Sequence, residues 1–121
     1  MTKLAIIDYG VGNLGSLIHA CNEADCNPVL LSNKADLEKT QATHLILPGV
    51  GAVGEALRQL RQRDMEEPLN TLVKEKGTLL LAICVGLQML AETCIEFGEH
   101  KGLGWIEGSS TDRIVPLNSD L

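Results

Sequence analysis

Aromatic side chains are almost missing from this 121-residue sequence, which has one Phe, one Trp and one Tyr. A hydrophobic core must therefore be built from Leu, Ile, Val and Ala, and a hydrophobic share of 45% is large enough to supply one. The same share excludes wholesale disorder, because disordered chains contain few such residues. A chain of this length fits one small domain.

Clusters of Lys and Arg are also missing, and the formal net charge is −6. Nucleic acids and anionic membranes attract clustered positive charge, so we expect neither as a partner. The longest apolar run, residues 79–87, is too short to cross a bilayer. No targeting leader is recognisable before the first apolar run, so we expect a cytoplasmic protein.

The four cysteines match no zinc-binding spacing, and an apolar chain of this kind needs no disulfide framework. We therefore expect reduced thiols and no metal. The four are Cys21, Cys26, Cys84 and Cys94.

Short apolar segments alternate with segments of helical periodicity along most of the chain. Strands that are apolar on both faces and alternate with helices are typical of a parallel sheet covered on two sides. We predict an α/β fold, an open, mostly parallel sheet with helices on both faces. The predicted strands span residues 4–7, 28–31, 44–47 and 78–83, and the predicted helices begin near residues 14, 32, 53 and 68.

A further helix is predicted after Cys84, because Leu87, Leu90, Ala91 and Cys94 recur at helical spacing. The pattern changes after Phe97, where a glycine-rich loop is predicted. A further strand is predicted at residues 113–117, after which no helix follows to cover it. We therefore expect a sheet that is incomplete at its C-terminal side, with an unpaired edge and uncovered apolar surface that favour self-association.

Two glycine-rich loops, residues 10–15 and 49–54, match the G-x-G-x-x-G pattern. A dinucleotide site also needs an acidic residue about twenty positions later, at the end of the next strand. Residues 29–32 contain none, and no strand follows the second loop at that spacing. The glycines are thus predicted to serve tight turns. Backbone N–H groups of the second loop could also hold a developing oxyanion.

Cys84 stands between a predicted strand and a predicted helix, with Ala82 and Gly86 two residues to either side. A nucleophile on a sharp strand-to-helix turn needs small neighbours at these positions. The helix dipole would favour the thiolate, and the Val85 N–H would face the attacked atom. Free cysteine is also among the most buried residue types, so the pattern alone leaves plain core packing open.

Four segments together, "IIDYGVGNLGSL", "LILPGVGAVGEALRQL", "LAICVGLQML" and "EFGEHKGLGWI", carry a resemblance. The chain resembles the class I (triad) glutamine amidotransferases, and within them the glutaminase subunits of imidazole glycerol phosphate synthases. The resemblance runs along almost the whole chain. It implies a flavodoxin-like fold in which residues 1–121 form the N-terminal part of a single glutamine amidotransferase domain.

The resemblance implies that Cys84 attacks the side-chain amide of glutamine, which releases ammonia and leaves a glutamyl thioester for water to hydrolyse. It implies no cofactor. It assigns an oxyanion hole, completed in such families by a reorientation of the glycine loop, to Gly49, Val50, Gly51 and Val85.

Substrate binding is assigned by the same resemblance to Gln88 and to Glu96, which would meet the ammonium group of glutamine. For Glu96, a solvated acid at a helix end remains an alternative. Tyr9, Gly10 and Asn13 are implied to face a (β/α)8-barrel cyclase subunit. That partner would take up the ammonia through a channel in histidine biosynthesis.

Class I enzymes use a histidine base oriented by a glutamate, as a His-x-Glu pair. His19, His44 and His100 are the histidines of this sequence, and none is followed by Glu two residues later. We therefore expect the 121-residue chain alone to be almost inactive. Open alternatives are a truncated or degenerate domain without catalysis, a thiol protein of redox or stress function, and a paralogous amidotransferase serving another synthase.

Overall fold

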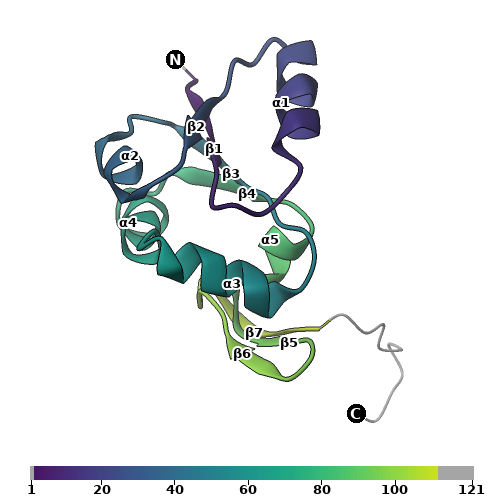
Figure 1. Cartoon of the computed structure of the whole chain (residues 1–121). Coiled ribbons are helices and arrows are strands. Elements are labelled where there is room, and N and C mark those ends of the chain that lie inside the picture. The colour runs from purple at the N-terminus through teal and green to yellow at the C-terminus, as the bar shows by residue number, and fades with distance from the viewer. Residues whose placement is uncertain (1, 112–121) are drawn as a thin grey trace.

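A computed structural model describes residues 2–111, so the strand predicted at residues 113–117 lies outside the described part. Its centre is a parallel four-stranded sheet in the order β2-β1-β3-β4 (Figure 1). All four predicted strands are present, with ends within one residue of those expected. They are β1 (Leu4–Ile7), β2 (Val29–Leu31), β3 (His44–Leu47) and β4 (Leu79–Ala82).

Helices cover both faces of this sheet, which confirms the predicted α/β architecture. Helix α1 (Leu14–Glu23) packs on one face, where Ile6 and Ile46 are buried. The other face carries the larger core and is covered by α2 (Lys34–Lys39), α3 (Val53–Gln62), α4 (Glu66–Asn70) and the π-helical turn η1 (Thr71–Glu75). Helix α2 begins two residues after the predicted start near residue 32, because the side chain of Asn33 accepts the capping hydrogen bond from Asp36 N.

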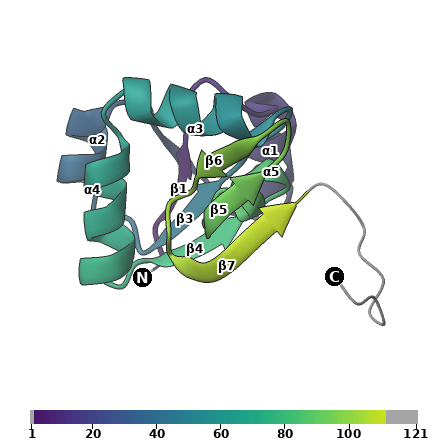
Figure 2. The ribbon, with the colours of Figure 1, turned by 90° about the horizontal axis from the view of Figure 1, so that it is seen from below.

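A second, three-stranded sheet follows the short helix α5 (Val85–Gln88), and Figure 2 shows it beside α3. It consists of β5 (Ala91–Ile95), β6 (Glu99–Lys101) and β7 (Ile106–Thr111) in the order β6-β5-β7. Strand β6 is antiparallel to β5, and β7 is parallel to it. The segment predicted as a glycine-rich loop is therefore largely strand.

The helix predicted through Cys94 was wrong, since α5 ends at Gln88 and β5 begins at Ala91. The pairing of β5 with β7 shifts register between Ala91 and Thr93. The extra residue lies in β7, where three steps from Ile106 to Ser109 match two in β5. The buried residues of β5, Ala91 and Cys94, are three positions apart, whereas a regular strand repeats every two. This spacing imitates the hydrophobic period of a helix.

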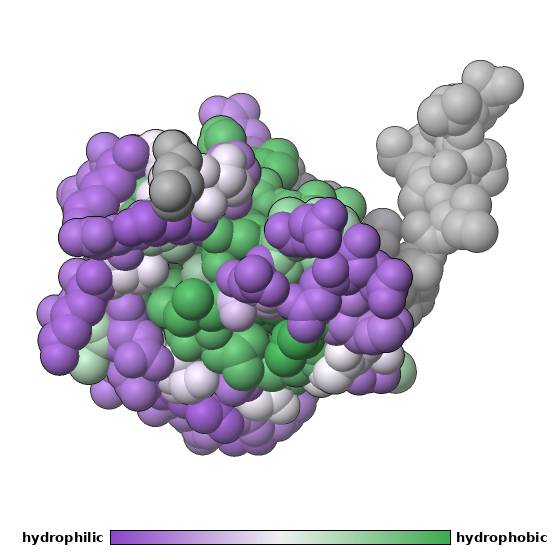
Figure 3. Space-filling view, turned by 90° about the horizontal axis from the view of Figure 1, so that it is seen from above, coloured by the Kyte–Doolittle hydropathy of each residue, from purple (hydrophilic) through white to green (hydrophobic). Residues whose placement is uncertain are grey.

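Strand β4 is an edge strand among the described residues, with β3 as its one neighbour in the sheet. Leu79 and Leu81 point to the α1 face but lie beyond the reach of α1, and they are 60% and 58% exposed. Figure 3 shows a hydrophobic area surrounded by hydrophilic residues on the face seen from above. Within residues 2–111, no helix has the length and hydrophobicity that a membrane span requires.

Candidate active site

Cys84 lies at the sharp turn from β4 into α5, where its backbone angles are φ 54° and ψ −123°. The N–H of Gly86 donates to the carbonyl oxygen of Ile83, 2.9 Å away, and closes a four-residue turn around Cys84. These angles are those of the first central position of a type II′ turn, which glycine normally occupies. A side chain held there costs about 1–3 kcal/mol, and such strain is concentrated at functional sites.

The thiol of Cys84 is exposed, and the structure does not bury it among the leucines of the core. Gly86 packs so closely on β3 that any Cβ would collide with the carbonyl oxygen of Leu47. This contact explains why a glycine stands two residues after the cysteine. The other cysteines behave as predicted for packing, with Cys21 and Cys94 buried and Cys26 half-buried.

The loop that follows β3 lies directly against this turn. A Cβ at Gly49 would come within 2.6 Å of the backbone nitrogen of Gly86. The N–H of Val85 donates to the carbonyl oxygen of Gly49, 3.2 Å away. The two segments assigned to an oxyanion hole are therefore in contact, but the Val85 N–H is occupied by the loop itself. Further along, Val50 is 54% exposed and Gly51 has a φ of +80° with open space around it.

Tyr9, expected at a partner-facing surface, has a fully buried side chain. Its hydroxyl donates to the carbonyl oxygen of Pro48 and lies 3.4 Å from the sulfur of Met89. Burial raises the pKa of the Tyr9 phenol well above its ordinary value. Tyr9 thus holds the start of the 49–52 loop, a contact that its position in the sequence did not indicate. Gly10 and Asn13 are exposed, as a partner surface requires.

Glu96 follows β5 and reaches the other end of the same loop. Its Oε1 accepts a hydrogen bond from the N–H of Val53, the first residue of α3, at 2.9 Å. Gln88 is half-buried at the end of α5, and its carbonyl oxygen accepts bonds from the Cys94 thiol and the Ser110 hydroxyl. The structure therefore brings the 49–51 loop against the turn that carries Cys84, with Gln88 at the end of the helix that follows Cys84 and Glu96 at the loop's far end.

No histidine of the chain is bonded to Cys84. His19 pairs with Glu23, and His44 contacts the hydroxyl of Thr43. His100, predicted in a loop, lies in β6, and its Nε2 is 3.0 Å from the carbonyl oxygen of Glu96. Because a carbonyl oxygen only accepts, this Nε2 carries the proton. A general base for Cys84 is thus not among these three side chains.

Two alternatives from the sequence find no support in the geometry. At the two helix starts where a phosphate could bind, an acceptor of the chain itself is already in place, since the side chain of Asn13 accepts from Ser16 N and that of Glu96 accepts from Val53 N. The redox hypothesis needs a buried acid beside the cysteine. Among the described residues, no charged side chain is buried.

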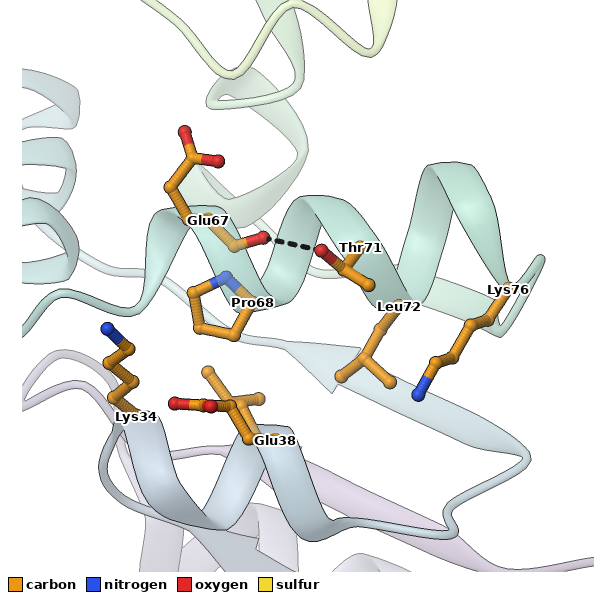
Figure 4. Close-up of a pocket in the computed structure, with 8 residues that line it drawn as sticks. Lys34, Glu38, Glu67, Pro68, Thr71, Leu72 and Lys76 are labelled. Atoms are coloured by element: carbon orange, nitrogen blue, oxygen red, sulfur yellow. Dashed lines mark hydrogen bonds between the residues drawn. The ribbon is translucent and has the colours of Figure 1, made fainter.

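A hollow of about 350 Å³ lies between α2 and α4 (Figure 4), and Figure 1 shows both helices on the side of the molecule away from α5. Lys34 and Glu38 line it from α2, and Pro68, Leu72 and Lys76 face them from the opposite segment. The Thr71 hydroxyl donates to the Glu67 carbonyl oxygen within its own helical segment. The hollow contains charges of both signs and no cysteine, and none of the residues assigned to the glutaminase reaction lines it.

Comparison with known proteins decides the family. A family model of the CobB/CobQ-like glutamine amidotransferase domain matches residues 17–112. The chain belongs to the glutamine amidotransferases. A solved structure described as a crystal structure of glutamine amidotransferase superposes with a TM-score of 0.67 at 24% identity, covering 83% of this chain and 51% of that one. This likeness supports the amidotransferase fold.

Two curated glutamine amidotransferase relatives illustrate how similar the sequences are. The chain is 38% identical over 125 residues to the imidazole glycerol phosphate synthase subunit HisH 2 of Nitrobacter winogradskyi, covering 100% of this chain and 58% of that protein. It is 42% identical over 114 residues to subunit HisH of Zymomonas mobilis, covering 91% and 53%. The chain therefore spans little more than half the length of these relatives.

Proposed function

We propose that this amidotransferase chain carries the nucleophile of a glutaminase, with Cys84 attacking the side-chain amide of glutamine. The supporting observation is the strained turn at Cys84, which exposes the thiol beside the 49–51 loop. In the proposed reaction the sulfur forms a thioester with the glutamine δ-carbonyl, and the C–N bond breaks to release ammonia. Water then hydrolyses the thioester to glutamate and restores the thiol.

The oxyanion of this reaction needs N–H donors that the loop does not yet present. Val85 N–H is bonded to the Gly49 carbonyl oxygen, so this carbonyl must turn away before the two backbone segments can hold one oxygen. The open space at Gly51 and the exposure of Val50 leave room for that turn. Gln88 is assigned to bind the amino acid substrate from the end of α5.

We further propose that the ammonia passes to a cyclase subunit with a (β/α)8 barrel, in the formation of imidazole glycerol phosphate in the cytoplasm. The two relatives described above support this proposal, since both are named as subunits of imidazole glycerol phosphate synthase. Exposed Gly10 and Asn13, between β1 and α1, are the surface assigned to that partner.

A domain without catalysis is the second candidate, because no histidine of the chain is bonded to Cys84. Loss of one member of a catalytic triad lowers turnover by several orders of magnitude. Both candidates have Cys84 on the same strained turn. They differ in whether glutamine is bound beside its thiol.

Protection of Cys84 from alkylation by glutamine separates them. The rate of iodoacetamide modification of each cysteine is followed by mass spectrometry, with and without glutamine. We expect glutamine to slow modification of Cys84 and to leave half-buried Cys26 unchanged, while asparagine, one methylene shorter, protects less. Equal rates at Cys84 with and without glutamine would support the domain without catalysis.

We also propose that the chain associates with itself through the edge of β4. Leu79 and Leu81 lie exposed beside an edge whose backbone groups have no strand partner among the described residues. Light scattering is expected to show an oligomer, and Leu81→Lys, a charge on the exposed face, is expected to shift it toward the monomer. A monodisperse monomer of the unaltered chain contradicts this proposal.

A further inference from the structure

Helix α1 ends in a tight backbone turn that contains two of the four cysteines. The N–H of Asp25 donates to the carbonyl oxygen of Asn22 at 3.0 Å. The N–H of Cys26 donates to the carbonyl oxygen of Cys21 at 2.8 Å. Asp25 has a φ of 57°, in the left-handed region. These features define a Schellman motif, in which Cys21 is the third residue before the cap residue Ala24 and Cys26 is the second residue after it.

The Schellman motif explains why both cysteines belong to one hydrophobic cluster. Side chains at these two positions frequently pack on each other as a hydrophobic contact that accompanies the motif. Here both positions hold cysteine, which packs as a small hydrophobic residue. Cys21 is buried in a cluster with Ile6 and Ile46, and Cys26 packs against the same cluster. Both thiols are free in the structure, so the end of α1 carries a pair of reduced cysteines.

The two thiols differ in how a reagent can reach them. A second hollow, of about 380 Å³, lies between the N-terminal segment and the turn after α1; Cys26 lines it and Cys21 does not. Lys3 and Asp25 bring one charge of each sign to its wall. Cys21 is 8% exposed, whereas Cys26 is half-buried. A small molecule in this hollow therefore meets Cys26 first.

We propose that Cys21 and Cys26 form a reversible disulfide by exchange with a low-molecular-weight disulfide. In the first step the Cys26 sulfur gives up its proton and attacks one sulfur of the reagent, whose S–S bond breaks to release one thiol and leave a mixed disulfide on Cys26. The Cys21 sulfur then gives up its proton, attacks the Cys26 sulfur and releases the second thiol. Two protein thiols are oxidised and one disulfide is reduced to two thiols, so the exchange needs no other oxidant.

This pair lies away from the candidate active site. In a parallel sheet, each connecting helix returns the chain from the C-terminal edge of one strand to the N-terminal edge of the next. Cys84 follows β4 at the C-terminal edge, whereas Cys26 precedes β2 at the N-terminal edge. The disulfide would thus link the end of α1 to the segment that enters β2, and it would leave the thiol of Cys84 unchanged.

Peptide mapping of the 121-residue chain tests the proposal. The folded chain is incubated with oxidised glutathione, the reaction is stopped with acid, and the remaining free thiols are alkylated in urea. Trypsin then releases residues 4–34, a peptide that contains Cys21 and Cys26 and no other cysteine. We expect this peptide to lose the mass of two hydrogen atoms and to carry no alkyl group, and reduced glutathione to reverse the change. A lasting glutathione adduct on Cys26, or alkylation at both cysteines, overturns the proposal.

Cysteine variants separate the two steps. Cys21→Ser should stop at the glutathione adduct on Cys26, because the second thiol is missing. Cys26→Ser should leave Cys21 without an adduct, because Cys21 does not line the hollow. Cys94→Ser, which removes a buried thiol outside the pair, is the matched control and should form the disulfide as the unaltered chain does. A glutathione adduct on Cys21 in Cys26→Ser would contradict the proposed order of attack.

The contribution of the helix end is measured by repeating the exchange in urea at fixed ratios of oxidised to reduced glutathione. The unfolded chain has to lose loop-closure entropy that the folded turn has already lost. We therefore expect the equilibrium constant for disulfide formation to be about tenfold smaller in urea than in the folded chain. Equal constants in the two states would show that closeness in sequence alone pairs the cysteines, and would overturn the role of the Schellman motif.

Discussion

The N–H of Val85 donates a hydrogen bond to the carbonyl oxygen of Gly49, 3.2 Å away. This bond ties the loop after β3 to the turn that carries Cys84, and it occupies the N–H that the proposed tetrahedral intermediate would need. If Cys84 acts as proposed, the Gly49 peptide has to turn before that N–H can hold an oxyanion. The same closeness also makes the position of Gly49 intolerant of a side chain.

Gly49→Ala tests this closeness. The new Cβ would lie 2.6 Å from Gly86 N and 3.1 Å from the backbone carbon of Val85. Backbone atoms cannot move aside as a flexible side chain can, so we expect a loss of about 1–3 kcal/mol in the free energy of unfolding. Urea denaturation measures it. An unchanged free energy of unfolding would show that Gly49 does not pack against the turn at Cys84 as described.

Replacing Cys84 separates the strain of the turn from the chemistry of the thiol. Both Cys84→Ala and Cys84→Gly remove the nucleophile, but only glycine adopts φ 54° and ψ −123° without a Cβ penalty. We expect Cys84→Gly to exceed Cys84→Ala in the free energy of unfolding by about 1 kcal/mol. If Cys84→Gly is less stable than Cys84→Ala in the same urea titration, the turn at Cys84 is not strained.

Tyr9→Phe tests the buried hydroxyl. The Pro48 carbonyl oxygen would lose its donor, so we expect a loss of about 1–3 kcal/mol near neutral pH. Burial raises the pKa of the folded-state phenol, so below about pH 10 both states keep the proton and its contribution is fully present. Above that pH the unfolded chain loses the proton first, and the free energy of unfolding falls. Between about pH 9 and pH 11, the free energy of unfolding should fall more for the unaltered chain than for Tyr9→Phe. An equal fall in both chains would contradict a buried, protonated Tyr9.

Gly54→Ala tests the contact between α3 and β6. Its Cβ would lie 2.5 Å from Cε1 and 2.8 Å from Nδ1 of His100, so either the ring or the strand has to shift. We expect a loss of about 1–3 kcal/mol in the free energy of unfolding. Gly15→Ala is the matched control, since its Cβ would meet only the Asn13 side chain at 3.8 Å. Alanine there should stabilise α1 by about 0.5–1 kcal/mol; equal effects at both glycines would contradict the described packing.

The parallel sheet could be predicted because its information is local. Residues 44–47 form an apolar run stopped by Pro48, and residues 53–60 show helical spacing, so each element is visible in its own segment. Strand β5 could not be predicted in the same way. Its buried residues, Ala91 and Cys94, have the spacing of a helix, and it forms a strand by pairing with β6 and β7, which come later in the chain.

In the candidate site too, local features could be predicted and long-range contacts could not. The small neighbours of Cys84 are two residues away in sequence, so the sharp turn at Cys84 could be recognised without coordinates. The bond between Glu96 and Val53 joins residues 43 positions apart, and the bond between Tyr9 and Pro48 joins residues 39 apart. No sequence period encodes such pairs, because tertiary packing alone brings them together.

Covalent labelling with 6-diazo-5-oxo-norleucine, an electrophilic analogue of glutamine, tests the central claim most directly. The chain is incubated with the reagent, digested, and the modified cysteine is located by mass spectrometry, with Cys84→Ala as the control. We predict modification of Cys84 and none of Cys21, Cys26 or Cys94, with free glutamine slowing the reaction. Labelling spread over several cysteines, or its absence at Cys84 while iodoacetamide still reacts there, would contradict a glutamine-directed nucleophile.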